Sequence, residues 1–260
     1  MKFVIIKKKI FWISFSLFLI AFFICLFLIF NYSFLSIQVS AFEEEDFYNK
    51  VQNLVNQKEK IAYLTFDDGP TLKSTSKILD VLKKENVKAT FFVVGKHVKK
   101  NSELVKREFQ EGHYIANHGY NHDNSKLYKS SESFINEIKS TDKEIGKAIG
   151  IDNYSSHVFR FPNGYMSSIY SSKKKEYVKL LSNIDYTYID WNCLNKDSEK
   201  KYSNYELLNN LKQSAKNKGT LVILMHDTSD VNQTDLVLKD SINYLKEQGY
   251  IFQNFYALKN

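Results

Sequence analysis

Residues 61 to 70 read Ile61-Ala62-Tyr63-Leu64-Thr65-Phe66-Asp67-Asp68-Gly69-Pro70. The first six residues are apolar or β-prone and predict a strand, which Gly69 and Pro70 bring to an end. Adjacent strand residues point to opposite faces, so Asp67 and Asp68 cannot do the same job if the strand continues through them. One carboxylate can bind a metal while the other handles a proton. The alternative is an ordinary polar turn, a place where Asp is common.

Strands of the same kind recur along the chain, with helical periodicity between them. We predict strands at residues 61–66, 88–94, 114–117, 157–161, 186–191, 220–225 and 250–255. Apolar residues at helical spacing, such as Leu104, Val105 and Phe109, lie in the intervening segments. Alternating strands and helices imply a parallel sheet, and about seven such units predict an α/β fold, a distorted (β/α) barrel. An open doubly wound sheet is the alternative, but no glycine-rich phosphate motif follows the first strand.

An almost unbroken apolar run occupies residues 10–30 and has the length of a membrane-spanning helix. The lysines before it place that end in the cytoplasm and the rest of the chain outside the membrane. A secretory signal cleaved near Ala41, which would release the protein, is the alternative. We therefore predict four segments: a cytoplasmic basic tail at 1–9, a transmembrane anchor at 10–30, a stalk at 31–59 and the functional domain at 60–260.

Composition excludes several classes of protein. The chain is 43% hydrophobic with two prolines, which is enough for one substantial core and argues against general disorder. Its formal charge is +7, but four of the lysines precede the apolar run. The remaining excess is too small to indicate nucleic-acid binding. Cys25 lies in the apolar run and Cys193 in the globular part, so no disulfide is expected between them.

Reactive side chains follow several of the predicted strands, where a parallel barrel places its functional residues. Beyond the two aspartates these are His118 and His122 after the third strand, Arg160 at the end of the fourth and His226 after the sixth. Two histidines four residues apart can share a metal on one side of a helical turn, and with one carboxylate they suit Zn²⁺ or a similar ion. No Glu follows His118, so the zinc-protease motif is absent. Surface histidines and a structural ion pair are the alternatives.

Four segments, taken in order, resemble successive motifs of the polysaccharide deacetylases, carbohydrate esterase family four. They are Thr65-Phe66-Asp67-Asp68-Gly69-Pro70, His118-x-x-x-His122, Arg160-Phe161-Pro162-x-Gly164 and Leu224-Met225-His226-Asp227. The resemblance covers about residues 60–255. It implies that Asp68, His118 and His122 are the metal ligands. It implies that Asp67 is the general base, that Arg160 orients this base, and that His226 is the general acid. Leu224 would then be an apolar wall of the acetyl pocket.

The chain departs from the family's pattern at three places. Gly119 stands where many members have Ser or Thr, and Asn163 where many have Tyr, near the backbone N–H expected to stabilise the oxyanion. The family's Asp-x-x-Asp-Trp motif is degraded. Asp197 aligns best with the carboxylate that tunes His226, and Asp190 is a second candidate for that role.

The resemblance implies a metal-dependent hydrolase that removes N-acetyl groups from a cell-wall polysaccharide, most simply the N-acetylglucosamine of peptidoglycan. The metal would be Zn²⁺, with Co²⁺ and Ni²⁺ as alternatives. We expect a monomer held to the membrane by its N-terminal helix, with the glycan as partner and no nucleic acid. Two other functions remain open: an O-acetyl esterase of the xylan type, and a catalytically silent sugar-binding module on the same fold.

Overall fold

The computed structural model describes residues 22–27, 29, 46–228 and 234–259. It divides into two compact units, Met1–Asp46 and Phe47–Asn260. In the first unit, residues 22–27 and 29 are helical, and the rest of the predicted anchor at 10–30 lies outside the described residues. Among the residues that are described, no helix combines the length and the apolar character needed to cross a bilayer.

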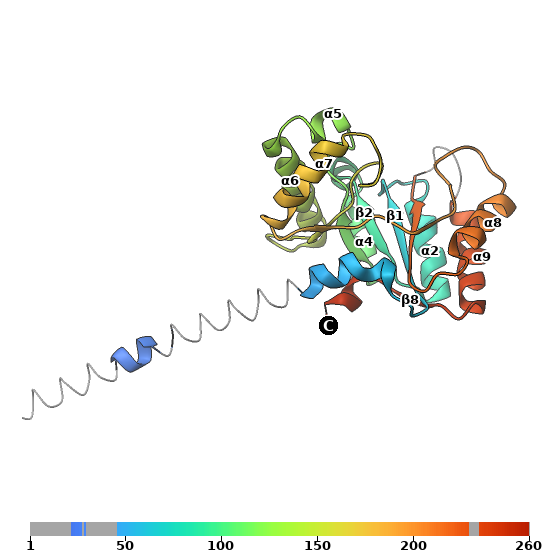
Figure 1. Cartoon of the computed structure of the whole chain (residues 1–260), viewed down its shortest axis with the longest axis horizontal. Coiled ribbons are helices and arrows are strands. Elements are labelled where there is room, and N and C mark those ends of the chain that lie inside the picture. Colours follow the sequence, from blue (N-terminus) through green and yellow to red (C-terminus); the bar gives the residue numbers. More distant parts are fainter. Residues whose placement is uncertain (1–21, 28, 30–45, 229–233, 260) are drawn as a thin grey trace, which may run out of the picture. The chain divides into compact units, whose positions relative to one another are not determined.

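The second unit is built on a parallel sheet that forms a half-barrel (Figure 1). The strands lie in the order β5-β4-β3-β2-β1-β7-β6, with β8 beside β1. Their bounds are β1 Ile61–Asp67, β2 Thr90–Val93, β3 Tyr114–Asn117, β4 Val158–Phe159, β5 Thr187–Tyr188, β6 Cys193–Leu194, β7 Leu221–His226 and β8 Ile251–Gln253. The predicted α/β fold of distorted-barrel type is confirmed. The short strand β6 was missing from the prediction.

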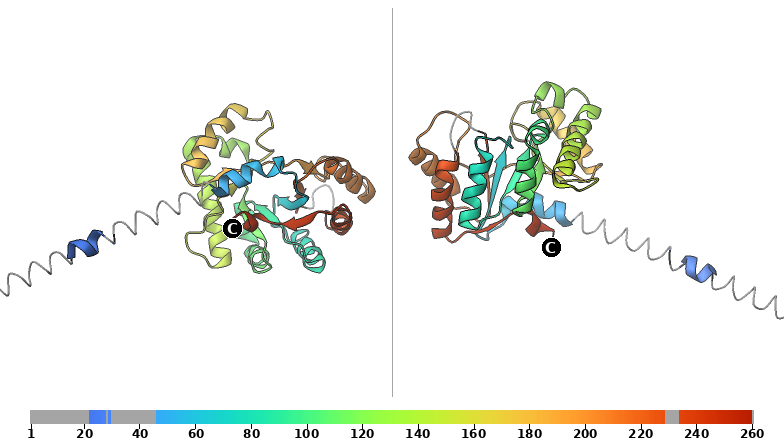
Figure 2. Two further views of the ribbon diagram at one scale, coloured as in Figure 1. Left: turned by 60° about the horizontal axis from the view of Figure 1, so that its bottom comes forward. Right: turned by 180° about the vertical axis from the view of Figure 1, so that it is seen from behind.

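Helices alternate with these strands (Figure 2). They are α2 Thr75–Glu85, α3 Gly95–Lys100, α4 Ser102–Gln110, α5 Asn124–Leu127, α6 Ser131–Ile149, α7 Ser171–Ser182, α8 Asn204–Ala215 and α9 Thr234–Glu247, with the 3₁₀ turns η1 Leu54–Asn56 and η2 Phe255–Leu258. Local signals define their ends. Ser130 caps α6 by accepting from the N–H of Ser133, and Gly150 ends it in the left-handed conformation. Ser203 and Glu206 form a capping box at α8.

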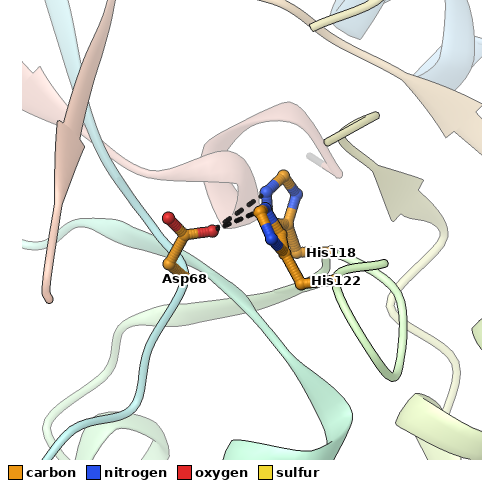
Figure 3. Close-up of side chains that lie close together, drawn as sticks. All are labelled: Asp68, His118 and His122. Carbon is orange, nitrogen blue, oxygen red and sulfur yellow. Dashed lines mark ion pairs between the residues drawn. The ribbon is translucent and has the colours of Figure 1, made fainter. Parts of the chain in front are cut away.

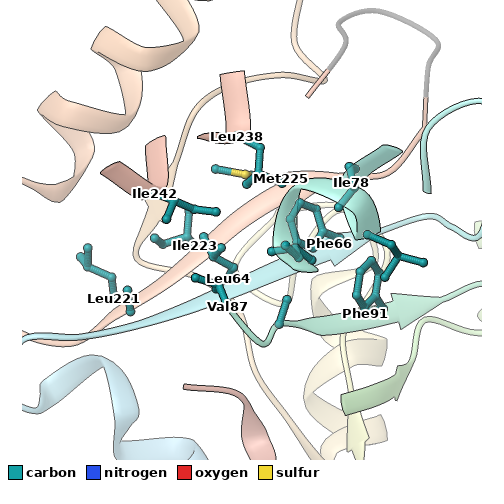
Figure 4. Close-up of a cluster of buried hydrophobic side chains, with 14 of the residues drawn as sticks. Leu64, Phe66, Ile78, Val87, Phe91, Leu221, Ile223, Met225, Leu238 and Ile242 are labelled. Atoms are coloured by element: carbon teal, nitrogen blue, oxygen red, sulfur yellow. The ribbon is translucent and has the colours of Figure 1, made fainter. Parts of the chain in front are cut away.

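The alternation along β1 divides the core into two layers. Leu64 and Phe66 lie on the helix-covered face, where they join Ile78 of α2 and Leu238 of α9 in one apolar cluster (Figure 4). Tyr63 belongs to a second cluster on the inner face of the half-barrel. The strand period of two therefore places Thr65 and Asp67 on the inner face as well. Both faces of the sheet are buried, as is usual for parallel sheets.

The amino end of the half-barrel is closed by segments from both ends of the second unit. Residues 46–53 are helical, and Val51 and Leu54 are fully buried in the inner cluster. The ring of Phe255 in η2 packs on Tyr63, with centroids 5.7 Å apart. Residues 47–56 fall in the range predicted as a stalk, and their burial extends the folded unit to Phe47.

Candidate metal and catalytic site

The two aspartates at the end of β1 point into one site because the strand stops between them. β1 ends at Asp67, and Asp68 has a left-handed backbone conformation with φ 76°. Asp tolerates this region better than most residues, at a cost of about 1–2 kcal/mol. His118 Nε2 lies 3.9 Å from Asp67 Oδ2 and 3.4 Å from Asp68 Oδ1. The opposite facing expected of adjacent strand residues does not apply here, since the chain leaves the strand after Asp67.

The histidine turn, residues 118–122, follows β3 and brings both predicted histidines to Asp68. It is not the helical turn expected from the four-residue spacing, because Gly119 has φ 80° and His122 has φ 51°. The imidazole centroids are 5.1 Å apart. His122 Nε2 lies 3.0 Å from Asp68 Oδ1, and both rings face this carboxylate (Figure 3).

The chemistry of these three side chains fits a divalent cation. One donor atom from each of Asp68, His118 and His122 lies within 4.8 Å of the others. Two ligands of a tetrahedral zinc with bonds of about 2.0–2.1 Å lie about 3.3 Å apart, close to the distances from Asp68 Oδ1 to the two Nε2 atoms. His118 Nδ1 lies 2.8 Å from the carbonyl oxygen of Arg160. Because a carbonyl oxygen can only accept, Nδ1 carries the proton, and Nε2 is free to bind a metal. Asp68 Oδ1 is buried, and among the described residues it faces the Nε2 atoms of both His118 and His122.

Electrostatics also keep the carboxylate of this set ionised. Burial alone would raise the pKa of Asp68, but the imidazoles of His118 and His122 outweigh it and hold that pKa well below its usual range. The hydrogen bond to Asp68 raises the pKa of His122. A cation that replaces the imidazole protons would keep the same attraction, so the set suits a metal ion in charge as well as in spacing.

Arg160 is fully buried beneath the site and contacts Asp67. One guanidinium nitrogen donates to Asp67 Oδ1 at 2.8 Å and to Thr65 Oγ1 at 2.7 Å, and Nε donates to the carbonyl of Ile189 at 3.0 Å. The guanidinium also lies 4.0 Å from the ring centroid of Phe92. A buried arginine held by this many contacts fixes the orientation of the Asp67 carboxylate.

His226 lies at the end of β7, opposite Asp67 in the strand register. Its Nδ1 is 2.7 Å from Asp197 Oδ1, and its backbone N–H donates to Asp197 Oδ2 at 2.8 Å. Burial alone would lower the pKa of His226, but the hydrogen bond and charge of Asp197, aided by the more distant charges of Asp67 and Asp68, raise it to about 9. His226 is therefore mostly protonated at neutral pH.

Asp190, the second candidate partner for His226, contacts a different part of the site. Its carboxylate accepts from the backbone N–H groups of Tyr165 at 2.8 Å and Met166 at 2.9 Å. These residues belong to the proline turn, residues 162–166, which follows Arg160. The ring of Trp191 packs under the same turn, since a Cβ on Gly164 would lie 2.8 Å from it. Asp190 and Trp191 thus hold the proline turn, and Asp197 alone of the two aspartates contacts His226.

The two remaining predicted site residues lie at the edges of this arrangement. Asn163 is exposed on the proline turn with φ 65°. Leu224 is buried on β7, opposite Thr65 in the register. Sequence reasoning missed Glu137, a buried carboxylate of α6 that bonds to the histidine turn. The available signal was its position on the apolar face of a helix, three residues after Phe134 and four before Thr141.

Comparison with known proteins agrees with this geometry. The sequence model of the family described as polysaccharide deacetylase matches residues 54–189. The chain belongs to the polysaccharide deacetylase family. This deacetylase is 37% identical over 209 residues to a peptidoglycan-N-acetylglucosamine deacetylase of Bacillus cereus, covering 77% of this chain and 71% of that protein. It is 34% identical over 203 residues to a peptidoglycan-N-acetylmuramic acid deacetylase of Bacillus subtilis, covering 77% and 72%.

Solved structures show the same relationship. A Streptococcus mutans CE4 esterase superposes with a TM-score of 0.71 at 31% identity, covering 80% of this chain and 90% of that one. The deacetylase is therefore a hydrolase of this family, and Asp68, His118 and His122 form its candidate metal site.

Proposed function

We propose that this polysaccharide deacetylase hydrolyses the N-acetyl group of N-acetylglucosamine in peptidoglycan and releases acetate, with Zn²⁺ at the Asp68–His118–His122 site. One observation carries the proposal: Asp67 and His226, a carboxylate and a protonated imidazole, lie opposite each other in the strand register beside those three ligands. The choice of sugar is supported by the Bacillus cereus relative. The choice of zinc is supported by the mixed carboxylate and imidazole donors, which Co²⁺ and Ni²⁺ also accept.

Asp67 is placed to act as the general base. A divalent cation held at this site supplies Lewis acidity toward a water molecule and toward the acetamide carbonyl. Asp67, oriented by Arg160 at 2.8 Å, accepts the proton of the attacking water. A backbone N–H near Asn163 would stabilise the charge that develops on the carbonyl oxygen. Leu224 would form an apolar wall for the acetyl methyl group.

His226 is placed to act as the general acid. With its pKa raised to about 9, it carries the proton that the departing amine needs. An amine leaves poorly without protonation, so this step matters more for an amide than for an ester. Asp197 holds the ring by Nδ1 and so directs Nε2 as the proton donor.

The experiment is acetate release from purified peptidoglycan, followed by mass spectrometry of the muropeptides. Asp67→Asn removes the general base but none of the three metal ligands, so it should abolish release while the protein retains its metal. Full activity of Asp67→Asn would overturn the mechanism. The fragment masses of the muropeptides identify which sugar has lost its acetyl group, and deacetylated muramic acid would favour the activity named for the Bacillus subtilis relative.

Two further functions are separated by the same assay. Faster acetate release from acetylxylan than from N-acetylglucosamine oligomers would establish an O-acetyl esterase. Tight glycan binding without turnover in added Zn²⁺ or Co²⁺ would establish a sugar-binding module. The ion found by elemental analysis of the purified protein identifies the native metal.

The proposed substrate also fits the predicted location. We propose that the apolar run at residues 10–30 anchors a monomer in the cell membrane with its catalytic unit outside, where peptidoglycan lies. Cell fractionation with sequencing of the mature N-terminus tests this. A soluble protein that begins near Phe42 would show that the segment is a cleaved signal.

A further inference from the structure

The histidine turn forms hydrogen bonds with two helices, α3 and α6. On one side, the N–H groups of Gly95 and Lys96, at the start of α3, donate to the carbonyl oxygens of Gly119 and Tyr120 at 2.9 and 3.0 Å. On the other side stands Glu137 of α6. The α3 contacts satisfy the carbonyl groups of Gly119 and Tyr120, and the N–H of Gly119 donates to Asn117 Oδ1 at 2.9 Å. The N–H groups of Tyr120 and Asn121 need an acceptor elsewhere.

Glu137 supplies that acceptor with both carboxylate oxygens. Its Oε2 accepts from the backbone N–H groups of Tyr120 and Asn121, each at 2.8 Å, and its Oε1 accepts from Asn121 Nδ2 at 2.5 Å. The residue is only 7% exposed. Hydrogen bonds to a charged group are stronger than those between neutral groups, and they are strongest where water is excluded. Three of them converge on this one side chain.

The two histidines differ in how their rings are held. His118 is buried, and its Nδ1 bonds to the carbonyl oxygen of Arg160. The side chain of His122 is 34% exposed, and the described residues provide its ring with no such bond at Nδ1. Its backbone also lies in the left-handed region, at φ 51°. The position of the His122 ring therefore depends on the backbone of the histidine turn.

We propose that Glu137 is a positioning residue for the metal: it fixes the histidine turn so that His122 Nε2 stays beside Asp68 Oδ1. Gly119 carries no hydroxyl that could tie the turn from within. A Cβ at Gly119 would lie 3.6 Å from Glu137 Oε2, so the carboxylate sits directly against this glycine. Among the side chains described here, Glu137 thus ties the N–H groups of Tyr120 and Asn121 to α6. This inference rests on the metal site of the proposed function.

The test is metal affinity rather than catalysis. The full-length chain in detergent is stripped of metal and titrated calorimetrically with ZnCl₂ and with CoCl₂. Loss of a side chain that orients a metal ligand costs about 10–100-fold in affinity, and we expect that loss for Glu137→Ala. Glu137→Gln, which keeps an acceptor oxygen but no charge, should recover part of the affinity. Glu132→Ala removes the same charge from the exposed first turn of α6 and should bind like the wild type.

The outcomes separate this inference from the proposed function. If the wild type binds neither metal, both fail. If the wild type binds and Glu137→Ala binds within about threefold of it, only the role of Glu137 is overturned. Should Glu137→Ala not fold, Glu137→Gln alone carries the test, and an affinity equal to that of the wild type overturns the proposal. The visible spectrum of bound Co²⁺ gives a second readout, because a displaced His122 alters the ligand geometry that the spectrum reports.

Discussion

The histidine turn and the proline turn are each fixed by a carboxylate, but the two turns hold different parts of the candidate site. In each, one carboxylate accepts two consecutive backbone N–H groups: Glu137 for the histidine turn and Asp190 for the proline turn. Glu137 is buried and comes from a helix behind the site, whereas Asp190 is half-buried and follows β5. Of these two turns, only the histidine turn carries candidate metal ligands. Damage to the first turn should therefore weaken metal binding, and damage to the second should slow turnover with the metal still in place.

The largest effect is expected from removing a candidate metal ligand of the histidine turn. His122→Ala removes one of three ligands and should lower acetate release by about a thousandfold, since the cation's Lewis acidity supplies several kcal/mol of transition-state stabilisation. Elemental analysis should show that the purified variant has lost its metal. His157→Asn, at a histidine remote from the site whose left-handed φ of 58° Asn tolerates, is the control. Retention of metal and activity by His122→Ala would remove His122 from the ligand set.

The second effect tests the proline turn. Asp190→Ala frees the N–H groups of Tyr165 and Met166, and a shift of about 1 Å in a turn beside the reacting atoms can cost up to about 100-fold in rate. We expect kcat to fall by about 10–100-fold while the Zn²⁺ affinity stays that of the wild type. The exposed Asp152→Ala is the matched control. If Asp190→Ala weakened Zn²⁺ binding as Glu137→Ala does, the two turns would not be separable.

The third effect lies outside both turns and concerns pH. In the proposed mechanism His226 must be protonated to donate, so we expect activity to be lost as the pH rises through its pKa, about 9 in the folded protein. Asp197→Asn removes the charge that raises this pKa and should move the alkaline limb of the kcat profile down by about one unit or more. Asp190→Ala should leave the limb where it is. An unshifted limb in Asp197→Asn would mean that another group supplies the proton.

The smallest effect compares the glycines of the two turns through stability. Gly119 and Gly164 have φ of 80° and 79°, but a Cβ at Gly164 would meet Trp191 at 2.8 Å, whereas Gly119 has room. Gly119→Ala should cost about 1–2 kcal/mol in unfolding free energy for its backbone alone. Gly164→Ala should cost about 1–3 kcal/mol more through overpacking. Gly150→Ala, with φ 74° and an open surrounding, calibrates the backbone term in the same urea titrations. Equal losses of unfolding free energy in Gly119→Ala and Gly164→Ala would show that the Trp191 ring moves to make room for the added methyl group.

Sequence reasoning located the reactive groups better than their supports. Asp68, His118 and His122 stood at predicted strand ends and matched a family motif, and the structure brings them together. The choice between Asp197 and Asp190 was open, since a degraded motif carries no distance information. In the structure, Asp197 is the aspartate that contacts the His226 ring.

The residues that hold the site and the core in place were harder to predict from the sequence. The position of Glu137 on the apolar face of a helix was a signal, but it did not show what the carboxylate contacts, because that depends on how α6 packs against the histidine turn. Val51 and Leu54 lie in a polar stretch whose apolar residues are sparse, so their place in the core could not be read from composition. In each case the deciding partner belongs to another element of the fold, so a pattern within one helix or one stretch of sequence does not reveal it.

The helical segment at residues 46–53 and the turn η1 lie at the amino end of the half-barrel, away from the candidate site. Gln57, just after the N-terminal helical segment, accepts from the N–H of Thr220 at the foot of β7, whereas Asp67 and His226 stand at the far ends of their strands. The polypeptide thus joins the catalytic unit at the pole opposite its reactive rim. An enzyme tethered through this connection would leave that rim unobstructed, and glycan strands could be scanned from the side turned away from the tether.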